Sequence, residues 1–169
     1  MTKANKYTKH LKIIAEDDSC RQLANGLMNV VSNNRAIDSI EISDGWLKSF
    51  DFFSDKEIER LKKFNNRILL LIIDSDNNVD SRFKKFKEKV PDEFKDRVYL
   101  LSSKGESEDL RSYFKSVFGK NSLELIGEKL AESCHRGKFD LWNCDQLKHN
   151  KPEIHRFYDS VKTFLCPNS

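Results

Sequence analysis

The chain lacks the features that mark membrane, secreted and thiolate-metal proteins. None of its apolar runs approaches the roughly 18 residues that a membrane-spanning helix requires. The basic opening, MTKANKYTKH, is not followed by an apolar segment with a small-residue cleavage site, so we expect no signal peptide. The four cysteines are scattered without a CxxC pair, a pattern that favours free thiols. We therefore expect a cytoplasmic protein with no membrane partner.

The chain also lacks internal repeats and low-complexity linkers, which favours a single folded domain. Its 169 residues suffice to bury one hydrophobic core. Hydrophobic residues make up 38% and charged residues 34%, and the aromatic share of 11% argues against disorder. The net charge of +3 is too small to indicate a nucleic-acid partner by itself, so the position of the basic residues carries more information.

Short apolar runs alternate with segments of helical spacing along the chain. Strands are predicted at residues 11–15, 37–42, 68–74 and 97–102, and helices at 82–89, 108–118, 122–134 and 153–165. Ser54 followed by Glu57 has the spacing of a capping box, which predicts a helix start there. The order of these elements predicts an α/β fold whose mostly parallel central sheet, of about four strands, lies between helices.

Three segments follow from this order. Residues 1–10 are predicted to be a flexible basic lead, and residues 11–118 to be the α/β core. Residues 119–169 are predicted to be a helical extension packed on that core, because the chain turns helical after its last strand.

The most informative segment is RILLLIIDSD, residues 67–76. A continuous apolar run of this length predicts a strand buried on both faces, and hence a central strand of a parallel sheet. Its end carries Asp74 and Asp76, which would share one side of the chain if it stays extended. Two like charges this close favour a hard divalent cation as their partner.

Carboxylates follow three of the predicted strands. If the strands are parallel neighbours, these groups share the carboxyl edge of the sheet, where α/β proteins place their chemistry. Oxygen-only ligands favour Mg²⁺ or Mn²⁺, which would support phosphodiester cleavage or transfer. The alternative is that these acids only favour helix N-termini, as Asp18 and Asp109 would. The groups are Glu16, Asp17 and Asp18, then Asp74 and Asp76, then Glu106, Glu108 and Asp109.

These motifs resemble the TOPRIM fold of topoisomerases, bacterial primases, overcoming-lysogeny-defect nucleases and several small stand-alone proteins. The resemblance covers about residues 11–118 and rests on KIIAE, which ends in Glu16, and LLIIDSD, which contains Asp74 and Asp76. It implies that Glu16 is the general acid/base and that Asp74 and Asp76 hold Mg²⁺. Nuclease-like branches add an acidic residue where the last strand meets its helix, a position that Glu108 matches.

The chain departs from the TOPRIM pattern at two positions. Asp17 follows the first glutamate, and Asn77 follows the D-x-D motif, where the family usually has glycine. Whether Asp17, Asp18 or Glu106 join the metal site stays open at this point.

A receiver domain of response regulators is a further alternative, because IIAEDD resembles its opening strand and acidic pair. That resemblance implies Asp74 as phosphoacceptor, Ser102 as the hydroxyl after the fourth strand, and Asp17 and Asp18 as Mg²⁺ ligands. Against it, the receiver lysine follows a fifth strand, whereas Lys104 comes directly after the fourth.

The segment RFKKFKEK offers a candidate nucleic-acid surface directly after the D-x-D strand. Its cations Arg82, Lys84, Lys85 and Lys87 would contact phosphates in a salt-sensitive manner. The alternative is an ordinary amphipathic helix with its phenylalanines in the core and its lysines in water.

The leading prediction is a magnesium-dependent nuclease, or a nuclease subunit, acting on DNA or RNA. Because the chain is too short to hold separate substrate-clamping domains, we expect it to work with a larger protein partner or as a homodimer. A non-catalytic binding or regulatory module of the same fold is the alternative.

Overall fold

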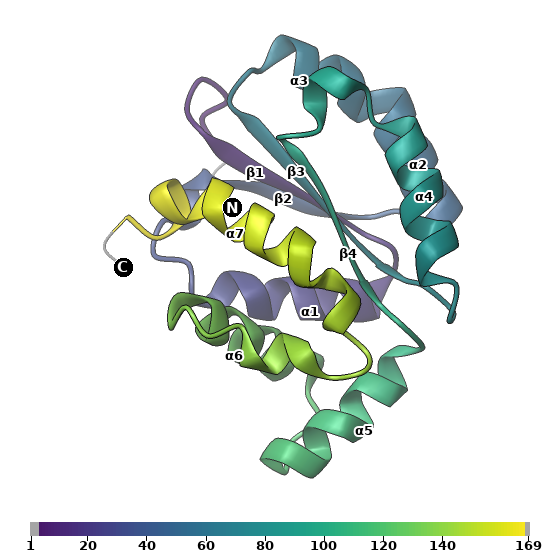
Figure 1. Ribbon diagram of the computed structural model, residues 1–169. Helices are drawn as coiled ribbons and strands as arrows, with labels where there is room; N and C mark the ends of the chain where they lie inside the picture. Colours follow the sequence, from purple (N-terminus) through teal and green to yellow (C-terminus); the bar gives the residue numbers. More distant parts are fainter. Residues whose placement is uncertain (1–3, 168–169) are drawn as a thin grey trace.

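The computed structural model describes residues 4–167 of the chain, so residues 1–3 of the predicted flexible lead lie outside the described part. Four strands form one parallel sheet in the order β2-β1-β3-β4 (Figure 1). The strands are β1 (His10–Ala15), β2 (Ile37–Ile42), β3 (Arg67–Asp74) and β4 (Val98–Ser103). The helices are α1 (Asp18–Asn29), α2 (Trp46–Phe52), α3 (Ile58–Lys63), α4 (Val79–Lys89), α5 (Ser107–Phe118), α6 (Leu123–His135) and α7 (Lys151–Leu165).

The predicted α/β class and the parallel sheet are confirmed. Each strand lies within one residue of its predicted bounds, because an apolar run bounded by charged or turn residues is a local signal. The four cysteines form no disulfide and are all buried. Within residues 4–167, every helix is too short or too polar to cross a membrane.

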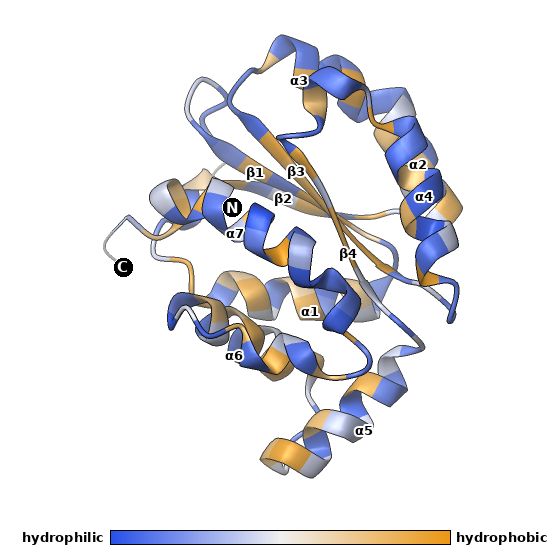
Figure 2. Ribbon diagram, viewed as in Figure 1, coloured by the Kyte–Doolittle hydropathy of each residue, from blue (hydrophilic) through white to orange (hydrophobic). Residues whose placement is uncertain are grey.

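The sheet is covered on both faces, which makes three layers. On one face, residues such as Leu70 and Leu101 pack against α1, α5, α6 and α7. On the other face, Leu69 and Leu100 pack against α2, α3 and α4. Figure 2 shows the consequence: the strands are mostly hydrophobic, whereas the helices present hydrophilic residues along with hydrophobic ones.

The C-terminal helices belong to the larger of these two hydrophobic clusters. Leu130 of α6 and Phe157 of α7 are buried in it together with Leu27 of α1 and Ile72 of β3. Residues after 118 therefore supply a large part of one face of the core.

Side chains near the start of α7 also close the free edge of β4. Asn150, in the short η5 turn (Lys148–Asn150), accepts the N–H of Ser102 at 2.9 Å and donates to its carbonyl at 2.7 Å. Further along the strand, Glu153 accepts the N–H of Leu100 and Arg156 donates to the carbonyl of Val98 at 3.1 Å. Strand β4 therefore does not present these groups as an open edge for another strand.

The predicted capping box at Ser54 is wrong. Residues Phe53–Glu57 form a π-helical segment (η2) that continues directly from α2, and the Ser54 hydroxyl donates to the carbonyl of Phe50. Glu57 is fully buried and binds the equally buried Arg67, with Nε and Oε2 2.8 Å apart. Glu57 thus forms a tertiary ion pair and does not cap the start of a helix.

Helices α1 and α6 cross at two glycines. An ideal Cβ at Gly26 would lie 1.9 Å from the carbonyl oxygen of Glu124, and one at Gly127 would lie 2.2 Å from that of Leu23. Such distances leave no room for a methyl group, so the backbones of the two helices touch here.

The substitution Gly26→Ala tests this contact. Alanine favours a helix by about 1 kcal/mol, but overpacking against a backbone carbonyl costs more, so we expect the free energy of unfolding to fall by about 2 kcal/mol. Urea denaturation measures the change. Asn25→Ala, at the neighbouring position, is the control and should change stability by less than about 0.5 kcal/mol. An unchanged or raised stability of Gly26→Ala would contradict the close crossing.

Candidate functional site

The carboxyl ends of β1 and β3 form the candidate site. These strands are adjacent, and from them the chain proceeds to opposite edges of the sheet: β1 leads to β2 at one edge, and β3 leads to β4 at the other. Ligands of open α/β sheets bind at such a reversal of strand order. Glu16 follows β1 directly and Asp74 is the last residue of β3, so both predicted acids lie at this reversal.

Glu16 and Asp74 are in direct contact. Glu16 Oε2 accepts a hydrogen bond from the backbone N–H of Asp74 at 2.8 Å. Asp74 Oδ1 accepts from the hydroxyl of Ser103, at the end of β4, and lies 3.9 Å from the sulfur of Cys20 in α1. Within the described residues, Glu16 Oε1 and Asp74 Oδ2 have no hydrogen-bond donor. Each carboxylate therefore keeps one oxygen for a ligand.

Both carboxyl groups hold their protons more strongly than usual. Burial raises the pKa of Glu16 to about 7, repulsion by Asp74, Asp17 and Asp76 adds to this, and the hydrogen bond from Asp74 N–H opposes it. Burial also raises the pKa of Asp74 to about 6, with repulsion from Asp17 and Asp76, while the Ser103 hydrogen bond opposes it. A cation at this place would relieve the repulsion between the carboxylates.

Asp17 and Asp18 serve the start of α1. Asp17 is the N-cap and accepts the N–H of Cys20 at 2.8 Å. Asp18 is exposed and forms an ion pair with Arg21, with 2.6 Å between Oδ1 and Nη2. These contacts agree with the helix-terminus alternative for both residues.

Asp76 lies beyond the end of the strand. The extended segment stops at Asp74, and Asp76 and Asn77 have φ values of 48° and 60°, in the left-handed region. Strand alternation therefore does not set the direction of the Asp76 side chain. Its carboxylate is 56% exposed and lies 3.5 Å from the guanidinium of Arg82.

The third acidic group is at the start of α5. Glu108 is mostly exposed and forms an ion pair with Arg111 at 3.7 Å, and Glu106 precedes the helix without a capping hydrogen bond from its side chain. Neither carboxylate has a contact with Glu16 or Asp74. Across residues 4–167, no group of three or more His, Cys, Asp or Glu side chains is arranged to hold a metal ion.

The predicted basic residues all lie on α4, but they differ in surroundings. The Arg82 guanidinium stacks over the ring of Trp46 at 3.7 Å, and the Lys85 ammonium is 5.3 Å from the same ring. Lys84 and Lys87 are exposed. Phe86 is buried in the core, as the amphipathic-helix alternative predicts.

Sequence reasoning missed three residues at this edge: Ser103, Cys20 and Trp46. Ser102 was the expected hydroxyl of a receiver-like site, but its side chain contacts His149 at 2.9 Å, and Ser103 is the residue paired with Asp74 in the register of β3 and β4. Two adjacent serines point to opposite faces of a strand, so only the register distinguishes them.

Comparisons of this chain with protein-family models, curated proteins and solved structures find no match. The TOPRIM relationship accordingly remains a hypothesis that rests on the motifs around Glu16 and Asp74.

The raised pKa values predict how stability depends on pH. Because the folded protein holds these two protons more tightly than the unfolded chain, whose carboxyl groups titrate near pH 4, the contribution of Glu16 and Asp74 to stability is greatest at low pH and falls as pH rises from about 4 to about 7. Asp74→Asn removes one of the repelling charges. We expect it to raise the free energy of unfolding at pH 8 by about 1 kcal/mol, after allowance for solvent screening, and to flatten the pH dependence.

Urea denaturation at pH 5 and pH 8 measures both effects. Asp159→Asn is the control, because Asp159 is exposed and its pKa is lowered by Lys162. Asp74→Asn would count against the proposed repulsion if it destabilised the protein equally at both pH values.

Proposed function

We propose that this protein carries out magnesium- or manganese-dependent phosphodiester chemistry on DNA or RNA, as a small nuclease or nuclease subunit of TOPRIM type. The observation that carries the proposal is the contact between Glu16 and Asp74 at the reversal of strand order, with one free oxygen on each carboxylate. Two partly buried carboxylates that repel each other form a polar site that a positive charge would stabilise.

The donor set fits a hard divalent cation. Mg²⁺ usually takes one or two carboxylates from the protein and completes its shell with water and substrate phosphates, so a third carboxylate is not required. Asp74 would hold the ion, with the charge of neighbouring Glu16 helping, and Asp76 would join after release of its ion pair with Arg82. When bound, such an ion polarises a phosphoryl oxygen and lowers the pKa of water.

Glu16 is suited to proton transfer. A carboxyl group with a pKa of about 7 exchanges its proton near neutral pH, which is the condition for efficient general acid/base catalysis. Its contact with the Asp74 N–H fixes one oxygen and leaves Oε1 for the reacting group. This agrees with the role that the TOPRIM resemblance implies.

Helix α4 would supply the contacts to the nucleic-acid backbone. It begins five residues after Asp74, so its first turns lie close to the site. Exposed Lys84 and Lys85 are available for phosphates. Arg82, already stacked on Trp46, pairs with Asp76 and would exchange this carboxylate for a phosphate.

A non-catalytic module that docks nucleic acid is the second candidate. The ion pair between Arg82 and Asp76 favours it, because this pair occupies a predicted metal ligand. The receiver alternative is weaker, since the described sheet has no fifth strand and the ammonium of Lys104 lies 3.0 Å from Asp145.

A metal titration tests the proposed site. At pH 8, with both carboxylates largely ionised, 10 mM Mg²⁺ or Mn²⁺ should stabilise the fold by about 1.4 kcal/mol for a Kd of about 1 mM, or a few degrees in melting temperature. Asp74→Asn should abolish this shift and Glu16→Gln should weaken it, while Asp159→Asn should retain it.

Cleavage assays with single- and double-stranded DNA and with RNA separate the two candidates. Metal-dependent cleavage that Asp74→Asn abolishes supports the nuclease. A metal-induced shift without cleavage of any substrate supports the docking module, and a shift that survives in Asp74→Asn would refute the site.

The role of α4 is tested by its lysines. The double variant Lys84→Ala/Lys85→Ala should weaken nucleic-acid binding and reduce the slope of log K against log salt by about 1.8 for two lost phosphate contacts on duplex DNA. The control is Lys62→Ala/Lys63→Ala, because these exposed lysines end α3 and precede the amino end of β3, at the opposite edge of the sheet. Fluorescence anisotropy over a salt series measures both slopes. Equal losses in the two variants would indicate non-specific attraction instead.

A further inference from the structure

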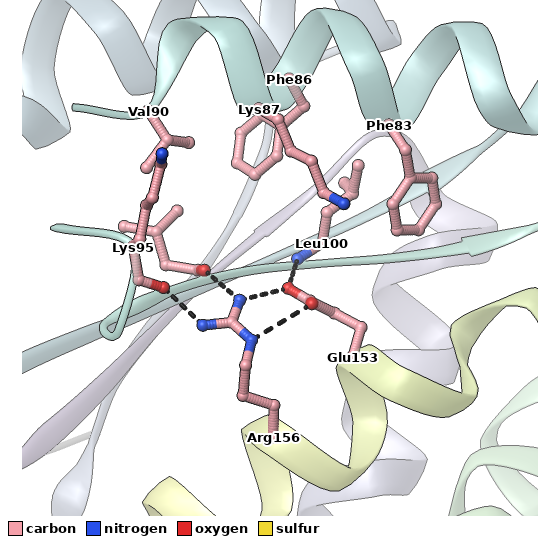
Figure 3. A pocket seen from close by; sticks show the side chains of 9 residues that line it. Phe83, Phe86, Lys87, Val90, Lys95, Leu100, Glu153 and Arg156 are labelled. Atoms are coloured by element: carbon pink, nitrogen blue, oxygen red, sulfur yellow. Dashed lines mark hydrogen bonds and ion pairs between the residues drawn. The ribbon is translucent and has the colours of Figure 1, made fainter. Parts of the chain in front are cut away.

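A cavity lies away from the carboxylates, where α4 and α7 approach β4. The cavity measures about 360 Å³ and is bordered by side chains from α4, from β4 and the loop before it, and from α7 (Figure 3). Its strand residues are Val98 and Leu100, whereas Asp74 pairs with Ser103 at the far end of β4. Three residues along a strand span roughly 10 Å, so this cavity is separate from the candidate active site.

The walls of the cavity are apolar. Phe83 and Phe86 come from successive positions on the inner face of α4, and Leu100 lies below them on the strand (Figure 3). Phe86 and Leu100 are almost fully buried, while Phe83 is half-buried. These rings and methyl groups form an apolar surface from which a flat hydrocarbon group readily displaces water.

Cations from three different elements border the same cavity: Lys87 from α4, Lys95 from the loop before β4, and Arg156 from α7. Figure 3 shows Lys87 directed from α4 toward the strand, and its ammonium forms no ion pair with any described residue. Lys95 pairs only with Asp92, which is exposed, and exposed pairs are weak.

The single carboxylate of the cavity is already used. Glu153 pairs with Arg156 at 2.7 Å and accepts the N–H of Leu100 at 3.3 Å. Arg156 is held in place by this pair and by the carbonyl of Val98. The lining therefore keeps an excess positive charge beside an apolar surface, and Lys87 is its unpaired member.

We propose that this cavity binds a small amphipathic anion: an aromatic or branched apolar body that carries one carboxylate, sulfonate or phosphate group. The body lies against Phe83 and Phe86, and the anionic group pairs with Lys87. The volume is at the lower end of the roughly 300–1,000 Å³ of small-molecule pockets, which favours a compact ligand over a macromolecular surface. This proposal is independent of the proposed nuclease function.

The test uses 8-anilinonaphthalene-1-sulfonate, which has a flat aromatic body and one sulfonate, and its uncharged analogue N-phenyl-1-naphthylamine. Fluorescence titration of the folded protein should show one site for the sulfonate and about tenfold weaker binding of the neutral analogue, as expected for the loss of one charge-assisted contact. Lys87→Met removes the charge but keeps an unbranched apolar side chain. It should weaken sulfonate binding about tenfold and leave the neutral analogue unchanged.

Lys89→Met is the matched control, because Lys89 is an exposed lysine of the same helix that pairs with Asp51 and does not line the cavity. It should change sulfonate binding by less than about twofold. Both lysines are exposed, so neither substitution should unfold the protein. Equal melting temperatures of the two variants will confirm this. The proposal is overturned if the sulfonate does not bind, if the neutral analogue binds as tightly, or if Lys89→Met loses as much affinity as Lys87→Met.

Discussion

The pairing of β1 with β3 is the contact on which the rest of the molecule depends. These two central strands are buried on both faces, and their parallel register brings Glu16 beside Asp74 at the point where the strand order reverses. The hydrogen bond from the Asp74 N–H to the Glu16 carboxylate extends the contact by one step beyond the strands. A shift of this register by one residue would turn the apolar residues of β3 to the wrong faces and would separate the two acids.

Burial disfavours the ionised forms of Glu16 and Asp74 unless a positive charge lies beside them. Glu16 and Asp74 are partly enclosed, and repulsion from Asp17 and Asp76 adds to the effect of burial on their pKa values. Exposed Asp18, in the first turn of α1, has a lowered pKa instead, because the side chains of Arg21 and Gln22 donate hydrogen bonds to it. This contrast supports a functional interpretation of the central pair, since perturbed carboxyl groups in a crevice are typical of sites that bind cations or move protons.

Helix α7 gives the edge strand two different surroundings. Asn150 satisfies the backbone of Ser102 completely, which closes β4 near the candidate active site. Further from that site, Glu153 and Arg156 reach the strand from one side while Phe86 and Lys87 reach over it from α4, and a cavity remains between them. Helix α4 thus borders both proposed sites, with Arg82 toward the carboxylates and Lys87 toward the cavity.

The amino-acid sequence by itself determined the four strands, their mostly parallel arrangement and the placement of Glu16 and Asp74 at strand ends, because apolar runs and the residues that stop them act locally. Only the tertiary structure decided that Asp76 leaves the strand direction and pairs with Arg82, that Ser103 rather than Ser102 contacts Asp74, and that Glu57 binds Arg67. Each of these depends on strand register or on packing between segments distant in sequence. Such contacts have no local pattern that a single sequence displays, since they form only when separate elements are brought together.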